Sequence, residues 1–160
     1  MTHRRLAEPW TAWRIGDPKG EHPIWDDGGA RRVEGRWHEA GAGVIYASLS
    51  YSTAMLEKLV HYSGTMPRGQ HFVEATIPVG TSYEVFSEAH HPGWQDRDGA
   101  VSRAFGRQWL AEARSAILVV PSVVARMERN VVVSTAHPEF AAMRTGPETP
   151  VWWDDRLFAR

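Results

Sequence analysis

The chain has 160 residues, 42% of them hydrophobic and 23% charged, which is typical of one globular domain with a substantial core. Its 18 basic and 19 acidic residues leave a formal net charge of -1, which excludes a global attraction to nucleic acid or anionic membrane. The absence of cysteine excludes disulfides, thiolate metal sites and cysteine nucleophiles. With no apolar run of signal-peptide or membrane-span length, we expect a soluble, cytoplasmic protein.

The N-terminal part of the sequence predicts a strand followed by a long loop. Residues 10–15 interleave rings with aliphatic side chains, as in a strand, and Arg14 interrupts this run. Arg14 could lie on a solvated strand edge or line a site. Residues 16–35 are rich in Gly, Pro, Asp and charge, and loops of this length often form sites.

A strand and a helix are predicted next. Residues 44–47 read as a buried strand, and residues 48–52 supply capping side chains for a helix over residues 49–62. The spacing predicts a buried stripe formed by Met55, Leu56, Leu59 and Val60. Glu57 falls on the flank of this stripe, where it could line a cleft or be an ordinary solvated glutamate.

The second half alternates short strands with one more main helix. Strands are predicted over residues 71–78, 82–86, 116–120, 131–133 and 149–155, with a helix over residues 99–114 and a short helix near residues 137–140. Neighbouring His90 and His91 lack a metal-ligand spacing, so we expect no metal site. Because helices and strands do not alternate strictly, the pattern indicates a single α+β domain and excludes a doubly wound sheet.

Two further groups of side chains are site candidates. The eight tryptophans can build the core and cleft walls, or stack on a ligand base; Trp37 and Trp94 are the better stacking candidates. Ser122 lies where an apolar strand ends, but no G-x-S-x-G elbow surrounds it. We therefore expect Ser122 to hydrogen-bond a ligand and not to act as a nucleophile.

Residues 31–57 bring the strongest chemical signal together. Arg36 can grip a phosphate with a planar fork of donors, Tyr46 offers a stacking face and a hydroxyl, and Glu57 can face a developing positive charge. Together they predict a site for a phosphate-bearing ligand that contains a ring.

These residues stand in motifs that resemble the RES-domain family, toxins of the RES-Xre toxin-antitoxin type. The motifs are G-R-W-H-E-A-G, V-I-Y-A-S, A-M-L-E-K-L-V-H, V-P-S-V-V-A-R-M-E-R-N-V-V-V, H-P-E-F and W-D-D-R-L-F, and they span nearly the whole chain. The resemblance implies one RES domain over residues 1–160, with short, mostly antiparallel strands and two main helices, similar to ADP-ribosyltransferase toxins. It also implies a toxin that consumes NAD as a substrate, uses no bound cofactor, and is neutralised by an Xre/ParS-like antitoxin.

Carried over position by position, the family motif assigns catalytic roles to Glu57, Arg36 and Tyr46, and substrate-binding roles to Arg36, Tyr46, Ser122 and Arg14. Glu57 would favour the oxocarbenium-like state formed as the nicotinamide-ribose bond breaks. Arg36 would hold the pyrophosphate, and Tyr46 would stack on nicotinamide or ribose. Ser122 would hydrogen-bond the ribose or the carboxamide. No G-x-G-x-x-G unit occurs, which argues against hydride transfer with a recycled cofactor.

Two questions stay open at the level of sequence. ADP-ribose could pass to a protein, to phosphate or to water, because the spare cations Arg31 and Arg32 could equally be a solvated loop pair. The alternative to an enzyme is a non-catalytic module that binds a nucleotide or a partner with the same Arg, Tyr and Glu side chains.

Overall fold

The computed structural model describes residues 4–158 as a mixed sheet with three α-helices. The strands are β1 Arg4–Arg5, β2 Trp10–Gly16, β3 Val44–Ser48, β4 His71–Ile77, β5 Ser82–Val85, β6 Ile117–Pro121, β7 Arg129–Ser134, β8 Arg144–Thr145 and β9 Thr149–Pro150. The helices are α1 Gly28–Arg32, α2 Tyr51–Leu59 and α3 Ala100–Ala111, with 3-10 turns η1 Glu88–His90, η2 Pro138–Ala142 and η3 Asp155–Leu157.

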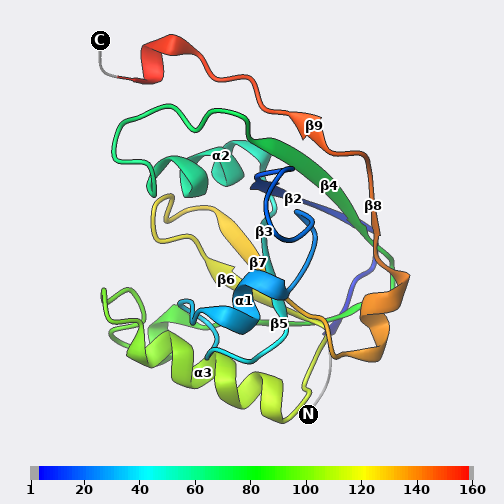
Figure 1. Cartoon of the computed structure of the whole chain (residues 1–160). Coiled ribbons are helices and arrows are strands. Elements are labelled where there is room, and N and C mark those ends of the chain that lie inside the picture. Colours follow the sequence, from blue (N-terminus) through cyan, green and yellow to red (C-terminus); the bar gives the residue numbers. More distant parts are fainter. Residues whose placement is uncertain (1–3, 159–160) are drawn as a thin grey trace.

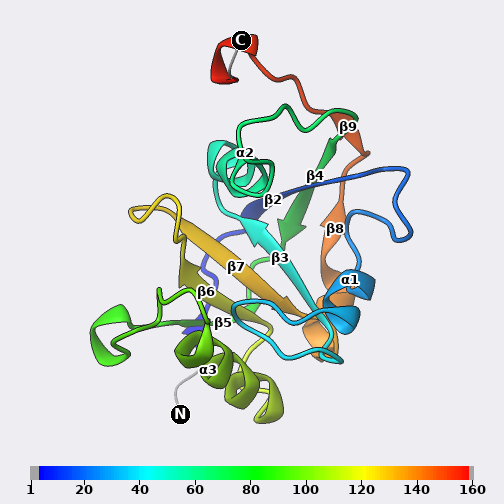
Figure 2. The ribbon, with the colours of Figure 1, turned by 60° about the vertical axis from the view of Figure 1, so that its left-hand side comes forward.

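The strands form one sheet in the order β1-β5-β6-β7-β3-β2-β4-β8, with β9 paired to β4. Every described pairing is antiparallel except β5 with β6. The predicted α+β class and the predominance of short antiparallel strands are therefore confirmed. Figures 1 and 2 show α2 and α3 at opposite ends of the molecule with the sheet between them.

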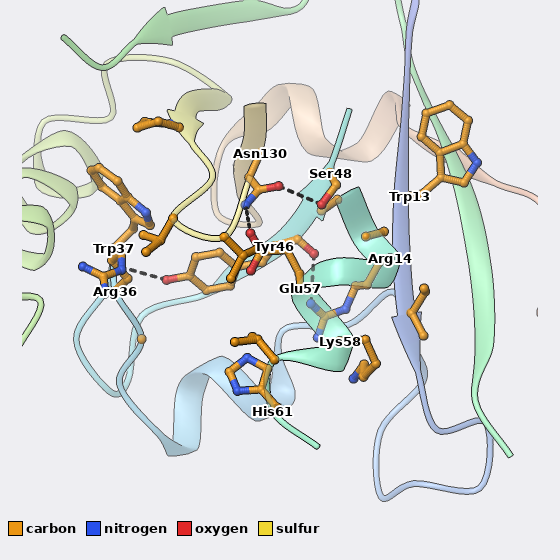
Figure 3. A pocket seen from close by; sticks show the side chains of 18 residues that line it. Trp13, Arg14, Arg36, Trp37, Tyr46, Ser48, Glu57, Lys58, His61 and Asn130 are labelled. Atoms are coloured by element: carbon orange, nitrogen blue, oxygen red, sulfur yellow. Dashed lines mark hydrogen bonds between the residues drawn. The ribbon is translucent and has the colours of Figure 1, made fainter. Parts of the chain in front are cut away.

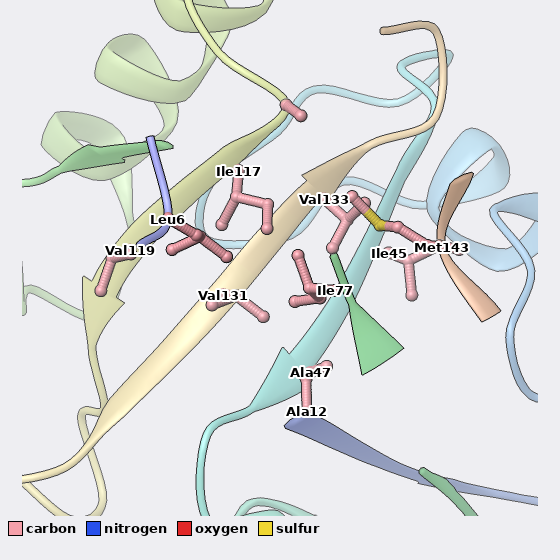
Figure 4. Packing of buried hydrophobic residues seen from close by; sticks show 11 residues of the cluster. Leu6, Ala12, Ile45, Ala47, Ile77, Ile117, Val119, Val131, Val133 and Met143 are labelled. Atoms are coloured by element: carbon pink, nitrogen blue, oxygen red, sulfur yellow. The ribbon is translucent and has the colours of Figure 1, made fainter. Parts of the chain in front are cut away.

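The sheet bends sharply where β3 meets β2. These two strands share a single registered pair, Trp13 with Ser48, whereas β2 and β4 pair along the whole of β2. The bend lets the β6-β7-β3 half pack against the β2-β4 half, so that Ala12 and Ile77 meet Val131 in the main core (Figure 4). The opened ladder between β2 and β3 leaves room for side chains to enter, and the cavity described below begins there.

Period-two alternation assigns the side chains of β3 to two different environments. Ile45 and Ala47 point into the main core. Val44 and Tyr46 belong to the opposite face, where they join a second cluster with Trp37 and Trp109 under α3. Ser48 follows in the same alternation, so this face carries the polar groups of the site.

The helices differ in part from what the sequence predicts. The expected helix over residues 49–62 is shorter as α2, and Leu56 and Val60 of its predicted buried stripe are 45% and 54% exposed. Apolar spacing identifies a helix face but not what covers it, and here only Val60 of that face borders the cavity described below. Helix α1 lies inside the segment predicted to be irregular, too short to give a periodic signal.

One strand prediction also needs correction. The expected last strand over residues 149–155 is limited to β9, after which the chain passes without ladder pairing into η3. Strands β4 and β5 follow one another across a short turn but do not pair, because β6, β7, β3 and β2 lie between them in the sheet.

Candidate functional site

A cavity of about 530 Å³ opens between α2, the β2-β3 junction and the loop that follows β6. Its walls include the predicted residues Arg14, Arg36, Tyr46 and Glu57, which come from three separate elements and one loop (Figure 3). The fold thus brings together a guanidinium pair, a phenol ring and a carboxylate that are up to 43 positions apart in the chain.

Glu57 is held from behind by two neutral donors. Its Oε1 accepts a hydrogen bond from the Ser122 hydroxyl at 2.8 Å and another from the Asn130 amide at 2.7 Å. Ser122 is in turn fixed because its Oγ accepts from the backbone N–H of Ala125 at 3.0 Å. No described residue donates to Oε2, so one carboxylate oxygen is anchored and the other is available to a ligand in the cavity.

The amide of Asn130 is oriented by a cross-strand partner. Asn130 at the start of β7 lies directly opposite Ser48 at the end of β3, and the Ser48 hydroxyl donates to Asn130 Oδ1 at 2.7 Å. Because an ionised carboxylate only accepts hydrogen bonds, the Nδ2 group must face Glu57. The chain Ser48, Asn130, Glu57 therefore has one arrangement of donors and acceptors (Figure 3).

Tyr46 is locked by its hydroxyl, and its ring forms part of the cavity wall. Both Ala30 O and Val33 O lie within 3.0 Å of Nε2 of buried His38, so this nitrogen carries the proton. In the neutral ring Nδ1 then accepts from the Tyr46 hydroxyl at 2.6 Å, and the hydroxyl accepts from the Trp37 N–H at 3.1 Å. Burial raises the pKa of Tyr46, against the opposing effect of the Trp37 hydrogen bond, so the phenol stays neutral.

Two backbone carbonyls orient the guanidinium of Arg36. Its Nη1 donates to Trp94 O and to Asp96 O, both at 2.9 Å. These bonds occupy one end of the guanidinium and leave Nε and Nη2 without a partner among the described residues. A planar group held in this way can still present two N–H donors to a phosphate.

Arg14 closes the gap at the bend of the sheet. Its Nη1 donates to Tyr46 O at 2.9 Å and its Nε to Ile24 O at 2.7 Å. The β2-β3 ladder has ended at this point, so Arg14 satisfies a strand carbonyl that β2 no longer reaches. Burial lowers the pKa of Arg14, but an arginine remains charged at any physiological pH.

Lys58 is a further cation on the cavity wall. It is half-buried, and its ammonium group makes no hydrogen bond or ion pair with any described residue. Burial first and the Arg14 charge second lower the pKa of Lys58, with Asp17 acting in the opposite direction.

The predicted residues are thus distributed between the cavity and its support. Arg14, Arg36, Tyr46 and Glu57 line the cavity, while Ser122 is fully buried and lies behind Glu57. Of the two tryptophans singled out for stacking, Trp37 borders the cavity and Trp94 is buried in the cluster under α3.

Sequence reasoning missed Asn130 and Lys58. Asn130 directly precedes the strand predicted over residues 131–133, and period-two alternation from Val132 places it on the site face. Lys58 follows a candidate carboxylate on a helix, where a solvated lysine is the ordinary expectation.

Two kinds of feature are absent from the described residues. No group of three or more His, Asp or Glu side chains in residues 4–158 could hold a metal ion. No described helix is long and apolar enough to cross a membrane.

Comparison with known proteins places these features in a family. The RES domain family matches residues 11–154. The Prs ADP-ribosylating toxin of Sphingobium sp. (strain YBL2) is 34% identical over 155 residues, covering 92% of this chain and 96% of that protein. A protein named Toxin Res from Pseudomonas putida (strain KT2440) is 33% identical over 135 residues, covering 81% of this chain and 90% of its own length.

A solved structure shares the fold. The crystal structure of the M. tuberculosis MbcT-MbcA toxin-antitoxin complex matches with a TM-score of 0.70 at 14% identity, over 91% of this chain and 85% of the matched chain. At that identity the likeness concerns the fold, and it agrees with the mixed α+β architecture described above.

Proposed function

This chain belongs to the RES domain family, and on that premise we propose that it is a cytoplasmic toxin enzyme that consumes NAD. It cleaves the bond between nicotinamide and ribose and transfers ADP-ribose to an acceptor, which is a protein, phosphate or water. The relative from Sphingobium carries the name of an ADP-ribosylating toxin, which supports the same class of reaction here.

The observation that carries this proposal is the half-anchored carboxylate of Glu57. Two neutral donors fix Oε1 and leave Oε2 at the wall of a cavity that Arg36 and Tyr46 also line. Neither donor is charged, and no basic side chain of the described residues pairs with this carboxylate. Such a fixed charge stabilises a positive centre that develops beside it, because no reorganisation is needed when the charge appears.

The reaction follows from this placement. As the carbon-nitrogen bond to ribose breaks, the electron pair leaves with the nicotinamide nitrogen, which loses its positive charge. The sugar carbon becomes oxocarbenium-like, and Glu57 Oε2 stabilises this charge directly or through a ribose hydroxyl. The acceptor oxygen or nitrogen then forms the new bond to that carbon and releases its proton.

The other residues bind and orient the substrate. Arg36 holds the pyrophosphate with its Nε and Nη2 groups, since its Nη1 is already committed to carbonyls. Tyr46 offers the face of a ring that its own hydroxyl bonds keep from turning, which limits the poses of nicotinamide. Ser122 acts through Glu57, because its hydroxyl already donates to Oε1 and accepts from Ala125. NAD is in this scheme a substrate.

An antitoxin of the Xre type is the proposed protein partner. The solved structure with the same fold is that of a toxin-antitoxin complex, which supports a partner of this kind. Val60, the C-terminal cap of α2, is exposed and lines the cavity, where a bound protein would hinder access of NAD.

Incubation of the purified protein with NAD tests the proposal, with released nicotinamide measured in water, in phosphate and in cell extract. We expect nicotinamide in at least one of these conditions, and radioactive NAD then identifies the acceptor by the labelled product. If no condition yields nicotinamide while the protein still binds ADP-ribose, the domain is a nucleotide-binding module and the enzymatic proposal is wrong.

A further inference from the structure

The chain contains two lysines and relies on arginine for its remaining basic side chains. Lys19 is exposed in the loop after β2, whereas Lys58 is half-buried on the cavity wall. Lys19 can therefore serve as the control for substitutions of Lys58.

The charge of Lys58 is not compensated within the described part of the molecule. Its sequence neighbour Glu57 is turned toward Ser122 and Asn130, and no carboxylate lies within ion-pair distance of the ammonium. The charged group that acts on it most is Arg14, which has the same sign. Asp17 offsets this repulsion only in part.

An ordinary structural role does not account for this position. Lys58 lies in the last turn of α2, where the interaction of a cation with the helix dipole stabilises the helix by about 0.3–1 kcal/mol. That benefit is the same for a fully solvated lysine, which would avoid both burial and the proximity of Arg14. Two cations that share a half-buried wall repel each other, and an anion between or beside them would offset this repulsion.

Arg14 has donors left for such an anion. Its Nε and Nη1 are committed to Ile24 O and Tyr46 O, while Nη2 has no partner among the described residues. In Figure 3, Arg14 and Lys58 lie at one end of the cavity, and Arg36 lies beyond the Tyr46 ring at the other. The cavity therefore has two cationic ends separated by the tyrosine and by Glu57.

We propose that Lys58 and Arg14 form a second phosphate-binding position in the cavity, separate from Arg36. Its ligand is a phosphate oxyanion, supplied either by the dinucleotide or by free inorganic phosphate that accepts ADP-ribose. The choice between these two sources rests on the proposed function, but binding of a phosphate group at this position does not.

The test is calorimetric binding of ADP-ribose and of inorganic phosphate to the parent, Lys58→Met, Lys58→Arg and Lys19→Met proteins. Loss of one charge-assisted contact should weaken binding about tenfold in Lys58→Met, with near-parent affinity in Lys58→Arg and in the Lys19→Met control. A loss confined to ADP-ribose assigns the position to the dinucleotide, and a loss confined to inorganic phosphate assigns it to the acceptor.

A second readout separates a binding role from a structural one. Because Lys58→Met removes an uncompensated half-buried charge, its ligand-free melting temperature should equal or exceed that of the parent. Saturating ligand should then raise it by less than it raises the parent value. Parent affinity of Lys58→Met for both ligands would overturn the proposal, as would the absence of binding to the parent protein. Neither result depends on nicotinamide release, so failure of the proposed reaction is recognised separately.

Discussion

Replacement of Asn130 by alanine tests how the fold positions the carboxylate. The change removes the amide that donates to Glu57 Oε1 at 2.7 Å, while the Ser122 hydroxyl at 2.8 Å remains. A hydrogen bond to a charged group contributes about 1.5–3 kcal/mol, and we take the lower end because water in the cavity can replace the lost donor. This predicts a fall in kcat/KM of about tenfold.

Replacement of Asn130 by aspartate should have a larger effect on the rate. Asn130→Asp should lower kcat/KM by more than Asn130→Ala, because two carboxylates in contact repel by about 5 kcal/mol at an effective dielectric constant near 20.

The assay is nicotinamide release from NAD, with far-UV circular dichroism and melting temperature to confirm folding. Ser48→Ala, which loosens the amide without removing it, should show the same fall in rate to a smaller degree. Ser52→Ala, at an exposed position of α2, serves as the matched control. An Asn130→Ala protein with the parent kcat/KM would refute the positioning role.

Three other substitutions give distinct outcomes. Tyr46→Phe leaves the Trp37 N–H without its acceptor and should lower the free energy of unfolding by about 1–3 kcal/mol, seen in urea titration, while ADP-ribose binding is largely kept because the ring remains. Gly106→Ala should destabilise the protein by about 1–3 kcal/mol although alanine favours helices, since the new methyl group would collide with the Trp37 carbonyl; a more stable variant would contradict this packing. Burial raises the pKa of Glu139, but hydrogen bonds from Ser82 outweigh this effect and lower the pKa overall. The contribution of ionised Glu139 to the free energy of unfolding is therefore present above the ordinary pKa of about 4.3, and it is lost as pH falls through the lowered pKa. Glu139→Gln should therefore be less stable near neutral pH by about 1–2 kcal/mol and match the parent in acid, as thermal melts at several pH values will show.

Much of the architecture was predictable because it depends on local patterns. The apolar runs over residues 44–47 and 116–120 predict strands directly, and β3 and β6 match these ranges to within one residue at each end. The α+β class follows from the irregular order of such runs. What local patterns do not give is pairing: the neighbours of β5 and the bend between β3 and β2 depend on contacts distant in sequence.

The candidate site was also predictable only in part. The residue types of Arg36, Tyr46 and Glu57 indicate the chemistry that they can perform, and all three line the cavity. Asn130 was missed because its partners Glu57 and Ser48 are 73 and 82 positions away, so no window of sequence contains the network. The two interpretations of Arg14 were likewise separable only by the bend that turns its side chain toward the Tyr46 carbonyl.

The most direct test of the account is a comparison of Glu57→Gln with the parent protein, measuring nicotinamide release from NAD and the affinity for ADP-ribose in parallel. Glutamine keeps the shape of the side chain and removes the negative charge that the oxocarbenium-like state requires. We predict that nicotinamide release is abolished while ADP-ribose still binds and the melting temperature stays near that of the parent. Nicotinamide release at the parent rate would contradict it.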